Sequence, residues 1–171
     1  GYLFDSPDAN TACHAALRAA GRAGTATALS LSDAGCVERH LDTFRDLIER
    51  QLNILFANEQ EAMALSGTTD VWSAVEWLRR EGLTAAVTRS EKGSIVVDGK
   101  TTVEVSAVPP SQLEDTTGAG DMYAAGFLYG YTNGWRHADS GALGARLASE
   151  AIAHLGARPQ KDIKPLLKQA A

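Results

Sequence analysis

The chain has 171 residues, a length that fits one ordinary domain, and its 44% hydrophobic and 22% charged residues are typical of a folded globular protein. The formal net charge is −5 at pH 7 and there is no run of Lys or Arg, so we expect neither nucleic acid nor an anionic membrane as a partner. No apolar run approaches the roughly 20 residues that span a bilayer, and no basic leader precedes the first apolar residues, which favours a cytoplasmic protein. Any anionic ligand must therefore be held by local donors.

Short apolar runs alternate with stripes of helical period through the first half of the chain. Pro7 directly after Asp5 and Ser6 indicates the start of the first helix, and Gly21 with Gly24 indicates its end. We expect strands at 2–4, 25–31, 53–57, 85–87, 94–97 and 102–105. We expect helices at 7–20, at 36–51, from 59, between 70 and 82, at about 118–131 and at about 138–155, with a short amphipathic tail after 159.

The order of these elements predicts an α/β fold. Strands joined by helices through short loops favour a doubly wound, mostly parallel sheet with helices on both of its faces. Asp98-Gly99 lies between the last two strands and indicates a β-hairpin. In such sheets ligands gather at the carboxyl ends of the strands, here after Leu31, Ala57 and Val87.

The segment from Asp115 to Asp121, DTTGAGD, precedes a long helical stripe and combines two glycines with two carboxylates. Gly118 and Gly120 let a ligand approach the backbone, where the unpaired N–H groups of a helix's first turn attract anions. Asp121 would repel a phosphate unless it had another task, such as accepting the proton of an attacking hydroxyl. Two interpretations remain open from these residues: an anion site with a general base, or a glycine-rich helix cap whose aspartate complements the helix dipole.

The same segment resembles the C-terminal signature of the ribokinase-like (PfkB) carbohydrate and nucleoside kinases, and it matches that signature completely. Six more segments resemble the family in the expected order, so that the resemblance covers nearly the whole chain. Residues 56–61 resemble the family's Asn-x-x-Glu motif, residues 87–93 resemble its nucleotide loop, and residues 156–159 resemble the end of its last core helix. Residues 2–5, 29–33 and 37–40 resemble the adenosine-kinase-like branch in particular.

The resemblance implies the roles of the signature residues. Asp121 would be the catalytic base that activates a substrate hydroxyl. The backbone of Gly118, Ala119 and Gly120 would stabilise charge on the transferred γ-phosphoryl group. The implied reaction moves that group from ATP to a hydroxymethyl of a nucleoside, adenosine-like, or of a sugar.

Further site residues follow from the same resemblance. Asn58 and Glu61 match the motif that positions Mg²⁺ and phosphate, through water because Mg²⁺ keeps much of its hydration shell. Without a ligand, the same pair would be an Asn that ends a strand and a Glu in a first helical turn. Thr88 and Gly93 match positions that line the ATP site, and Ser90 stands where many sugar kinases have Gly.

Two residues of the signature carry further implications. Thr117 matches a position at the ATP site. In some members of the family the positions of Asp115 and Thr117 bind a monovalent cation, which makes K⁺ a candidate cofactor beside ATP and Mg²⁺.

The remaining cysteines and histidines do not predict a metal site. Cys13 and Cys36 lie far from each other and from any Cys or His at ligand spacing, which favours two reduced thiols over a disulfide or a zinc site. His14 and His40 fall within expected helices and His137 in a turn, where packing or surface roles are the simpler interpretation.

The first half of the family's fold, with its Gly-Gly motif and its β-sheet lid, is not contained in the sequence. We therefore expect residues 1–171 to form a single partial ribokinase-like domain, the ATP side, which is inactive as a kinase without the acceptor site. Its partners would be ATP, a small hydroxyl acceptor, and a complementing N-terminal half or a second copy. The alternative is a non-catalytic nucleotide-binding α/β module, or a subunit completed by another chain; the residues do not identify the acceptor.

Overall fold

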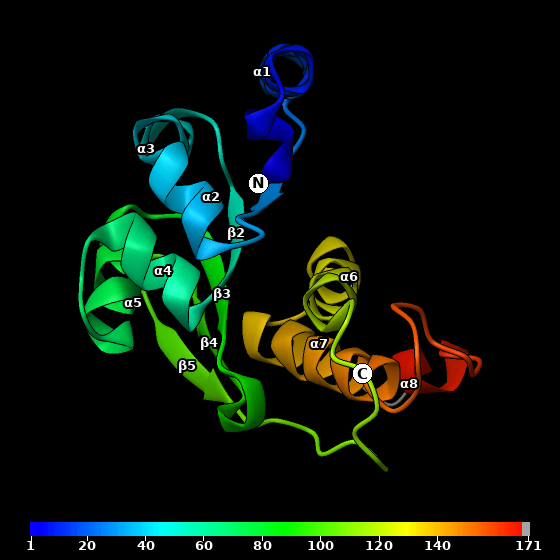
Figure 1. Cartoon of the computed structure of the whole chain (residues 1–171). Coiled ribbons are helices and arrows are strands. Elements are labelled where there is room, and N and C mark those ends of the chain that lie inside the picture. The colour runs from blue at the N-terminus through cyan, green and yellow to red at the C-terminus, as the bar shows by residue number, and fades with distance from the viewer. Residues whose placement is uncertain (169–171) are drawn as a thin grey trace. The chain divides into compact units, whose positions relative to one another are not determined.

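The structure, a computed structural model, describes residues 1–168 (Figure 1). Contacts divide the chain into two compact units, one of residues 1–87 with 97–102 and one of residues 88–96 with 103–171. The elements in chain order are the 3-10 helix η1 (Tyr2–Asp5), α1 (Pro7–Ala23), β1 (Ala28–Ser30), α2 (Ala34–Arg39), α3 (Leu41–Arg50), β2 (Ile54–Asn58), α4 (Glu59–Ser66), α5 (Val71–Arg80), β3 (Thr84–Thr88), the 3-10 helix η2 (Ser90–Lys92), β4 (Ser94–Val97), β5 (Thr102–Val105), α6 (Ala119–Thr132), α7 (His137–Ala151) and α8 (Lys164–Lys168).

The five strands form one sheet in chain order, β1-β2-β3-β4-β5, which confirms the predicted α/β class with a mostly parallel sheet flanked by helices. β1 and β2 run parallel, with Ala28 opposite Ile54 and Ser30 opposite Phe56. Four of the five residues of β2 are buried, as a strand covered on both faces requires. The fully buried side chains of the first unit include Leu31, Phe44, Leu47, Leu55, Leu65 and Leu78.

The predicted strand at 2–4 is wrong, because these residues belong to η1. The N–H of Phe4 donates to the carbonyl of Gly1 at 3.0 Å, and this tight turn directs the Phe4 ring inward. The ring packs edge-on against Phe44, with 5.1 Å between the ring centroids. A run of three apolar residues is compatible with a strand or with one helical turn, and here the burial of a single aromatic ring decides.

The predicted helix at 36–51 is two helices, α2 and α3, which meet at His40. Asp33 fixes the start of α2 by accepting a hydrogen bond from the N–H of Cys36 at 3.0 Å. His40 leaves the helical conformation, with φ −122° and ψ 25°, and its carbonyl accepts from the N–H of Phe44 at 3.0 Å as α3 begins. Buried apolar residues on both sides of the break keep the helical period and hide the break from the sequence pattern.

Local capping and turn signals are confirmed. Asp70 caps α5 by accepting from the N–H of Ser73 at 3.0 Å. Gly24 ends α1 in the left-handed conformation, with φ 64°, where a residue without a Cβ is favoured. Asp98 accepts from the N–H of Thr101 at 2.7 Å in the turn between β4 and β5.

In the second unit, α6 and α7 pack closely because small residues line their contact. A Cβ built on Gly126 would lie 2.8 Å from the Cα of Gly144, and one on Gly130 would lie 2.5 Å from the Oγ of Ser140. Protein interiors are too densely packed to absorb such contacts without moving an element. The distance between the two helices therefore depends on glycine at these points.

The loop between β5 and α6 is held by Asp115. One carboxylate oxygen accepts from the N–H of Thr117 at 2.9 Å, and the other accepts from the N–H of Gly156 at 3.0 Å. The N–H of Glu114 donates to the carbonyl of Ile152 at 3.0 Å, which ties the same loop to the end of α7. The hydrogen bonds from Thr117 and Gly156 favour the ionised form and lower the pKa of Asp115 from 3.8 to about 2.

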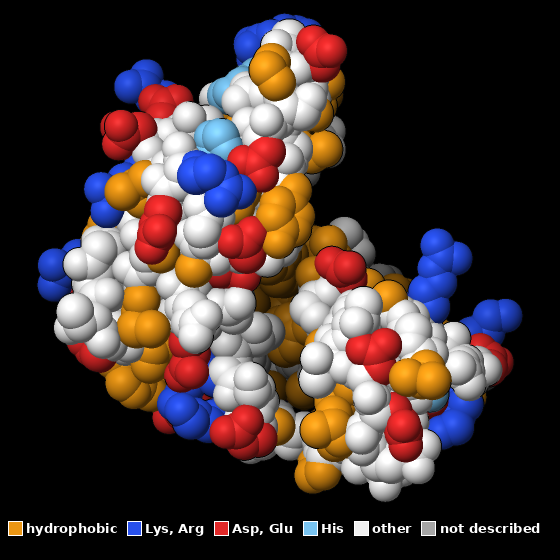
Figure 2. Space-filling view, in the orientation of Figure 1, with side chains coloured by type: hydrophobic (Ala, Val, Ile, Leu, Met, Phe, Trp, Pro, Cys, Tyr) orange, Lys and Arg blue, Asp and Glu red, His pale blue; other side chains and the backbone are white. Residues whose placement is uncertain are grey.

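Charged side chains of both signs are interspersed over the face in Figure 2, where Lys and Arg are scattered rather than gathered into one basic patch. Within residues 1–168, no helix combines the length and the apolar character needed to cross a membrane.

Replacing Gly126 with Ala should destabilise the second unit by about 1–3 kcal/mol, because the added methyl group would force α6 away from α7. Gly21→Ala is the matched control: Gly21 also lies in a helix, but its Cβ position has nothing within 4 Å. The control should be neutral or stabilising by up to about 1 kcal/mol. Urea titration gives the free energy of unfolding, and equal changes in the two variants would contradict the packing argument.

Asp115→Asn should lower stability at neutral pH and lose this effect in acid. A carboxyl whose pKa is about 2 in the folded chain and 3.8 in the unfolded chain stabilises above pH 4, and this contribution disappears as the pH falls toward 2. The difference in unfolding free energy between the chain and its variant should therefore shrink over that interval. Glu114→Gln, at the exposed neighbouring carboxylate, is the control for the loss of one negative charge. A pH-independent Asp115→Asn difference would refute the assignment.

Candidate functional site

The N-terminus of α6 presents unpaired backbone N–H groups. Gly118 is the N-cap, with φ 80° and ψ 0°, and its carbonyl accepts from the N–H of Met122 at 2.9 Å. The N–H of Ala119 donates to the carbonyl of Thr116 at 3.2 Å. In the described part of the chain, no hydrogen bond uses the N–H of Gly120 or of the following residue. Two donors at the positive end of a 14-residue helix therefore remain available to an anion.

The two glycines of the predicted anion site serve different purposes. A Cβ on Gly118 would lie 2.5 Å from the carbonyl oxygen of Ala157, and its φ is in the left-handed region, so the chain's own packing requires glycine there. At Gly120 a Cβ would meet nothing within 4 Å, and the residue is helical. Neither packing nor conformation explains a glycine at this second position, so it is the one that leaves room for an external group.

Asp121 lies in the first turn of α6 and is exposed. It is the residue directly after Gly120, so an anion held by the free N–H groups would lie close to a carboxylate. Thr117, also predicted to contact the ligand, is exposed, and its N–H is used by Asp115. The structure thus brings Asp115 and Thr117 together by a hydrogen bond, immediately before Gly118 and the free donors.

The loop after β3 holds the other residues predicted for ATP. Thr88 ends β3, and the N–H of Arg89 donates to the carbonyl of Gly93 at 2.7 Å across the turn. Gly93 has φ 84°, and a Cβ there would overlap the carbonyl oxygen of Val105, so the backbone itself requires this glycine. Ser90 adopts φ 52°, in the left-handed region where glycine is the favoured residue.

A buried hydroxyl pair beneath α6 was missed by the sequence reasoning. The Tyr123 hydroxyl and the Ser94 Oγ lie 2.7 Å apart, and both residues are almost fully buried. Burial raises the pKa of Tyr123 to about 12, so the phenol stays protonated at neutral pH. The pair joins the helix that carries Asp121 to the strand that follows Gly93. The only sign of this pair in the sequence is Ser94, a polar residue at the start of a buried apolar strand, and it does not identify Tyr123 as the partner.

Asn58 and Glu61 belong to the first unit and form a reciprocal cap at the start of α4. The Asn58 side-chain oxygen accepts from the N–H of Glu61 at 2.9 Å, and the two Glu61 oxygens accept from the backbone N–H and side-chain amide of Asn58 at 2.9 and 2.7 Å. Glu61 is 5% exposed, and burial raises its pKa above the ordinary value of 4.5. Asn58 and Glu61 therefore have a structural role as a helix cap, whether or not a metal ion binds.

The structure thus groups the predicted residues into three local clusters. The signature from Asp115 to Asp121 and the loop from Thr88 to Gly93 lie in the second unit, and the cap of Asn58 and Glu61 lies in the first. Each cluster is held by hydrogen bonds between its own residues.

The sequence and the fold both resemble known kinases. The model of the "pfkB family carbohydrate kinase" matches residues 1–164. A cytidine kinase from Thermococcus kodakarensis is 38% identical over 118 residues, which is 67% of this chain and 42% of that protein. An adenosine kinase structure from Sinorhizobium meliloti is 45% identical, with a TM-score of 0.94, and the match covers 99% of this chain and 52% of that one.

A ribokinase structure from Arabidopsis thaliana, complexed with ribose and ATP, is 27% identical with a TM-score of 0.72, over 90% of this chain and 50% of that one. The chain therefore spans about half the length of these relatives. The family model nevertheless covers nearly all of it, including both compact units and the whole signature from Asp115 to Asp121. On this evidence the chain belongs to the pfkB family of carbohydrate kinases.

Proposed function

We propose that this chain is the ATP side of a phosphotransferase that moves the γ-phosphoryl group of ATP to a hydroxymethyl group of a nucleoside, adenosine-like, or of a sugar. The observation that carries the proposal is the start of α6, where unused N–H groups, an unexplained glycine at 120 and the exposed carboxylate of Asp121 occupy consecutive positions. A folding requirement accounts for Gly118 but not for this combination.

Each residue of the signature then has a physical task. The backbone of Gly118, Ala119 and Gly120 places the helix N-terminus against the transferred group, where its partial positive charge offsets the negative charge of the phosphoryl oxygens. Asp121 accepts the proton of the attacking hydroxyl, which needs a carboxylate within hydrogen-bonding reach of that hydroxyl. Thr117 lies one residue before the cap and lines the same ligand.

The donor set of the first unit fits a hydrated Mg²⁺ ion. Asn58 and Glu61 offer the hard oxygen atoms that Mg²⁺ prefers, but both Glu61 oxygens already accept hydrogen bonds from Asn58. Water-mediated contact is the mode that these satisfied oxygens allow. Mg²⁺ bound with ATP would neutralise charge on the phosphate oxygens.

Thr88 and Gly93 would line the nucleotide in the same proposal, and Asp115 is the candidate ligand of a monovalent cation such as K⁺. Each carboxylate oxygen of Asp115 accepts one backbone N–H and keeps a lone pair for a cation. The S. meliloti relative is named an adenosine kinase and the T. kodakarensis relative a cytidine kinase, which supports a nucleoside acceptor. The Arabidopsis ribokinase, complexed with ribose and ATP, supports ATP as the donor and keeps a sugar acceptor open.

In this proposal residues 1–171 are part of one larger ribokinase-like domain, completed by an N-terminal half or by a second copy of the chain. Positioning of both reactants supplies much of the rate of such reactions, so the chain by itself should bind nucleotide weakly and turn over no acceptor. The alternative is a non-catalytic nucleotide-binding module, or a subunit that another chain completes. Joining the chain to the N-terminal half of the S. meliloti adenosine kinase and assaying adenosine, ribose and fructose separates the two; no turnover with any acceptor favours the alternative.

In the completed enzyme, Asp121→Asn should lower kcat by at least about 100-fold, because general-base catalysis is typically worth 10²–10⁴-fold. Nucleotide binding, measured by calorimetry, should persist, since the free N–H groups remain. Asp139→Asn is the matched control: Asp139 is also an acidic residue in the first turn of a helix, but it pairs with Arg136 at 2.7 Å. Full activity in Asp121→Asn, or an equal loss in the control, would exclude Asp121 as the base.

Gly120→Ala should separate ligand binding from folding. The added methyl group meets no atom of the chain within 4 Å and replaces a helical glycine, so the variant should be as stable as the parent or more stable by up to about 1 kcal/mol. In the completed enzyme it should nevertheless weaken ATP binding and lower kcat/KM, because the methyl group occupies the space offered to the phosphate. Unfolding by urea and steady-state kinetics give the two readouts, and an active, stabilised variant would count against phosphate approach at this position.

A further inference from the structure

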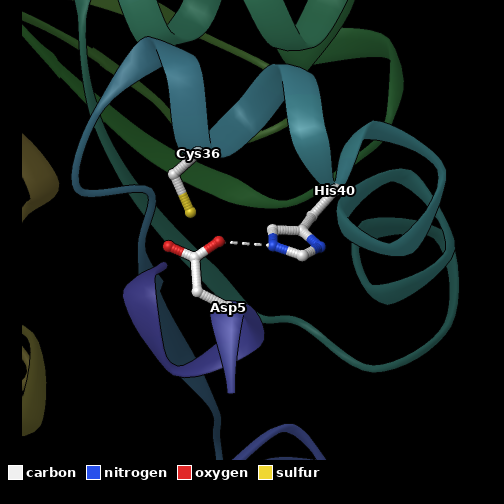
Figure 3. A group of neighbouring side chains, drawn as sticks. All are labelled: Asp5, Cys36 and His40. Atoms are coloured by element: carbon white, nitrogen blue, oxygen red, sulfur yellow. Dashed lines mark hydrogen bonds and ion pairs between the residues drawn. The ribbon is translucent and has the colours of Figure 1, made fainter. Parts of the chain in front are cut away.

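Three side chains of different chemistry converge in the first unit, and none of them belongs to the proposed kinase site. Asp5 comes from η1, Cys36 from α2, and His40 from the junction between α2 and α3 (Figure 3). One carboxylate oxygen, the sulfur and one ring nitrogen all lie within 4.8 Å of one another. No sequence spacing links Asp5 to the other two, so the cluster exists only in the folded chain.

The individual positions suit a metal ion. The Nε2 of His40 and the Oδ1 of Asp5 are 2.7 Å apart and already face each other. Cys36 is fully buried, and within residues 1–168 no hydrogen bond is recorded to its sulfur. A tetrahedral zinc ion with bonds of about 2.0–2.3 Å holds its ligand atoms less than about 4 Å apart. To share one ion, the Asp5 and His40 atoms must move apart from 2.7 Å to about 3.3 Å, and the sulfur, which lies within 4.8 Å of both, must approach them to about 3.6 Å.

We propose that Asp5, Cys36 and His40 form a binding site for a borderline-soft divalent cation of the Zn²⁺ type. Thiolate, imidazole and carboxylate are the three ligand classes that Zn²⁺ takes from proteins, and a sulfur ligand disfavours Mg²⁺ and Ca²⁺. Binding replaces the thiol proton of Cys36, which leaves to solvent, while His40 ligates as neutral imidazole. Water fills the fourth position.

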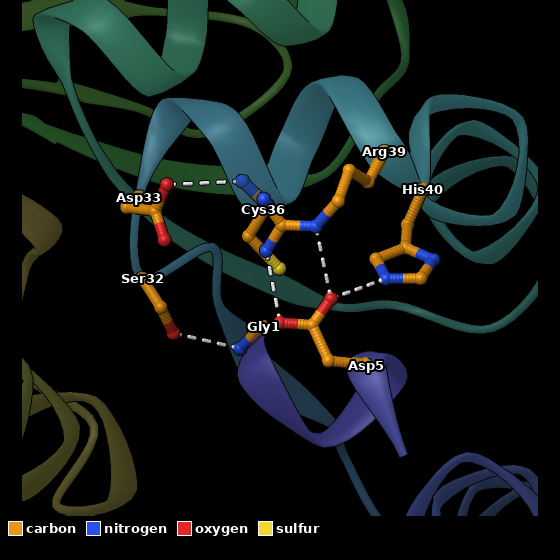
Figure 4. Close-up of polar contacts among 7 residues, drawn as sticks. All are labelled: Gly1, Asp5, Ser32, Asp33, Cys36, Arg39 and His40. Carbon is orange, nitrogen blue, oxygen red and sulfur yellow. Dashed lines mark hydrogen bonds and ion pairs between the residues drawn. The ribbon is translucent and has the colours of Figure 1, made fainter. Parts of the chain in front are cut away.

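The groups around the three ligands hold them in place. Arg39 donates from Nη2 to the Oδ2 of Asp5 at 2.9 Å and from Nε to Oδ1 at 3.1 Å (Figure 4). With the ion on Oδ1, the Nη2 bond to Oδ2 is retained and orients the carboxylate, as outer-shell partners of metal ligands commonly do. The N–H of Cys36 donates to Asp33 at 3.0 Å, which fixes the start of α2 and with it the position of the sulfur.

Aromatic rings restrict the orientation of the imidazole. His40 lies 6.2 Å from Phe44 and 6.3 Å from Phe4, measured between ring centroids. Phe4 is 3% exposed and Phe44 is fully buried, so both rings beside the imidazole are part of the core. The side chains of His40 and Asp5 are 21% and 38% exposed, which leaves a path from solvent to the ligands.

An ion pair of Asp5 with Arg39 and His40 is the competing explanation of the same contacts. It accounts for the low pKa of Asp5, about 2, through hydrogen bonds from Arg39 and His40. It gives no role to the sulfur of Cys36, because a salt bridge needs only charged partners. Participation of the thiol is therefore the property that distinguishes a metal site from a surface ion pair.

The test titrates the reduced, tag-free 171-residue chain with Zn²⁺ by calorimetry and with Co²⁺ by absorption, which reports a cobalt–thiolate bond directly. We expect one Zn²⁺ per chain, a thiolate-to-cobalt band, and a higher Tm with Zn²⁺. Cys36→Ser should abolish the band, and Cys36→Ser, His40→Gln and Asp5→Asn should each weaken Zn²⁺ binding at least about 10-fold, since loss of even an outer-shell partner costs about 10–100-fold.

Cys13→Ser and His14→Gln are the matched controls, because they remove the other free cysteine and a neighbouring histidine from α1 without touching the three ligands. Both should keep the band and the affinity. Circular dichroism verifies the fold of every variant. If Cys36→Ser does not fold, the Zn²⁺ affinities of His40→Gln and Asp5→Asn test the proposal. The proposal is overturned if Co²⁺ gives no thiolate band, if Cys13→Ser removes it, or if the ligand variants bind Zn²⁺ as tightly as the parent. These readouts do not depend on kinase activity.

Discussion

The turn ahead of α6 depends on one carboxylate that gathers two backbone N–H groups from distant parts of the chain. Asp115 accepts from Thr117, two residues on, and from Gly156, 41 residues on. With the loop fixed at both points, Gly118 can hold its left-handed conformation against Ala157, and α6 begins with N–H groups that the described residues leave unused. The helix end that attracts anions is therefore positioned by a carboxylate of the protein itself, Asp115, whose oxygens accept backbone hydrogen bonds.

The glycines of the two candidate loops, after β3 and before α6, show how differently the same residue type can be used. Gly93 and Gly118 are required by the chain, since a Cβ at either position would run into the backbone of Val105 or Ala157. Gly120 is required by nothing in the described structure. Packing therefore separates glycines that shape the loop from one whose absent side chain suits an external ligand, a distinction that the motif by itself does not make.

Several polar groups in the first unit are satisfied by near neighbours in the sequence. The cap of Asn58 and Glu61 closes on itself within one helical turn, so that the side-chain oxygens of both residues accept hydrogen bonds within the cap. The cluster around Asp5 follows a different rule, because its partners come from residues 34 and 35 positions later. Short-range capping fixes where each helix starts, and long-range pairs of this kind join the elements to one another.

The sequence by itself determined the α/β class, the places of most helices and strands, and the signature from Asp115 to Asp121. These features are encoded locally, in hydrophobic period, in capping residues such as Asp70, and in glycines that punctuate turns. It failed at 2–4 and at His40, where a short apolar run and an unbroken apolar stripe are each compatible with more than one backbone path.

Tertiary structure alone decided which groups meet. The pairing of Tyr123 with Ser94, the tether from Asp115 to Gly156 and the approach of Asp5 to Cys36 all join residues far apart in sequence. No local pattern encodes such pairs, because each depends on the summed geometry of every element between the two partners. For the same reason a spacing rule dismissed Cys36 as a ligand, whereas the fold places it beside an imidazole and a carboxylate.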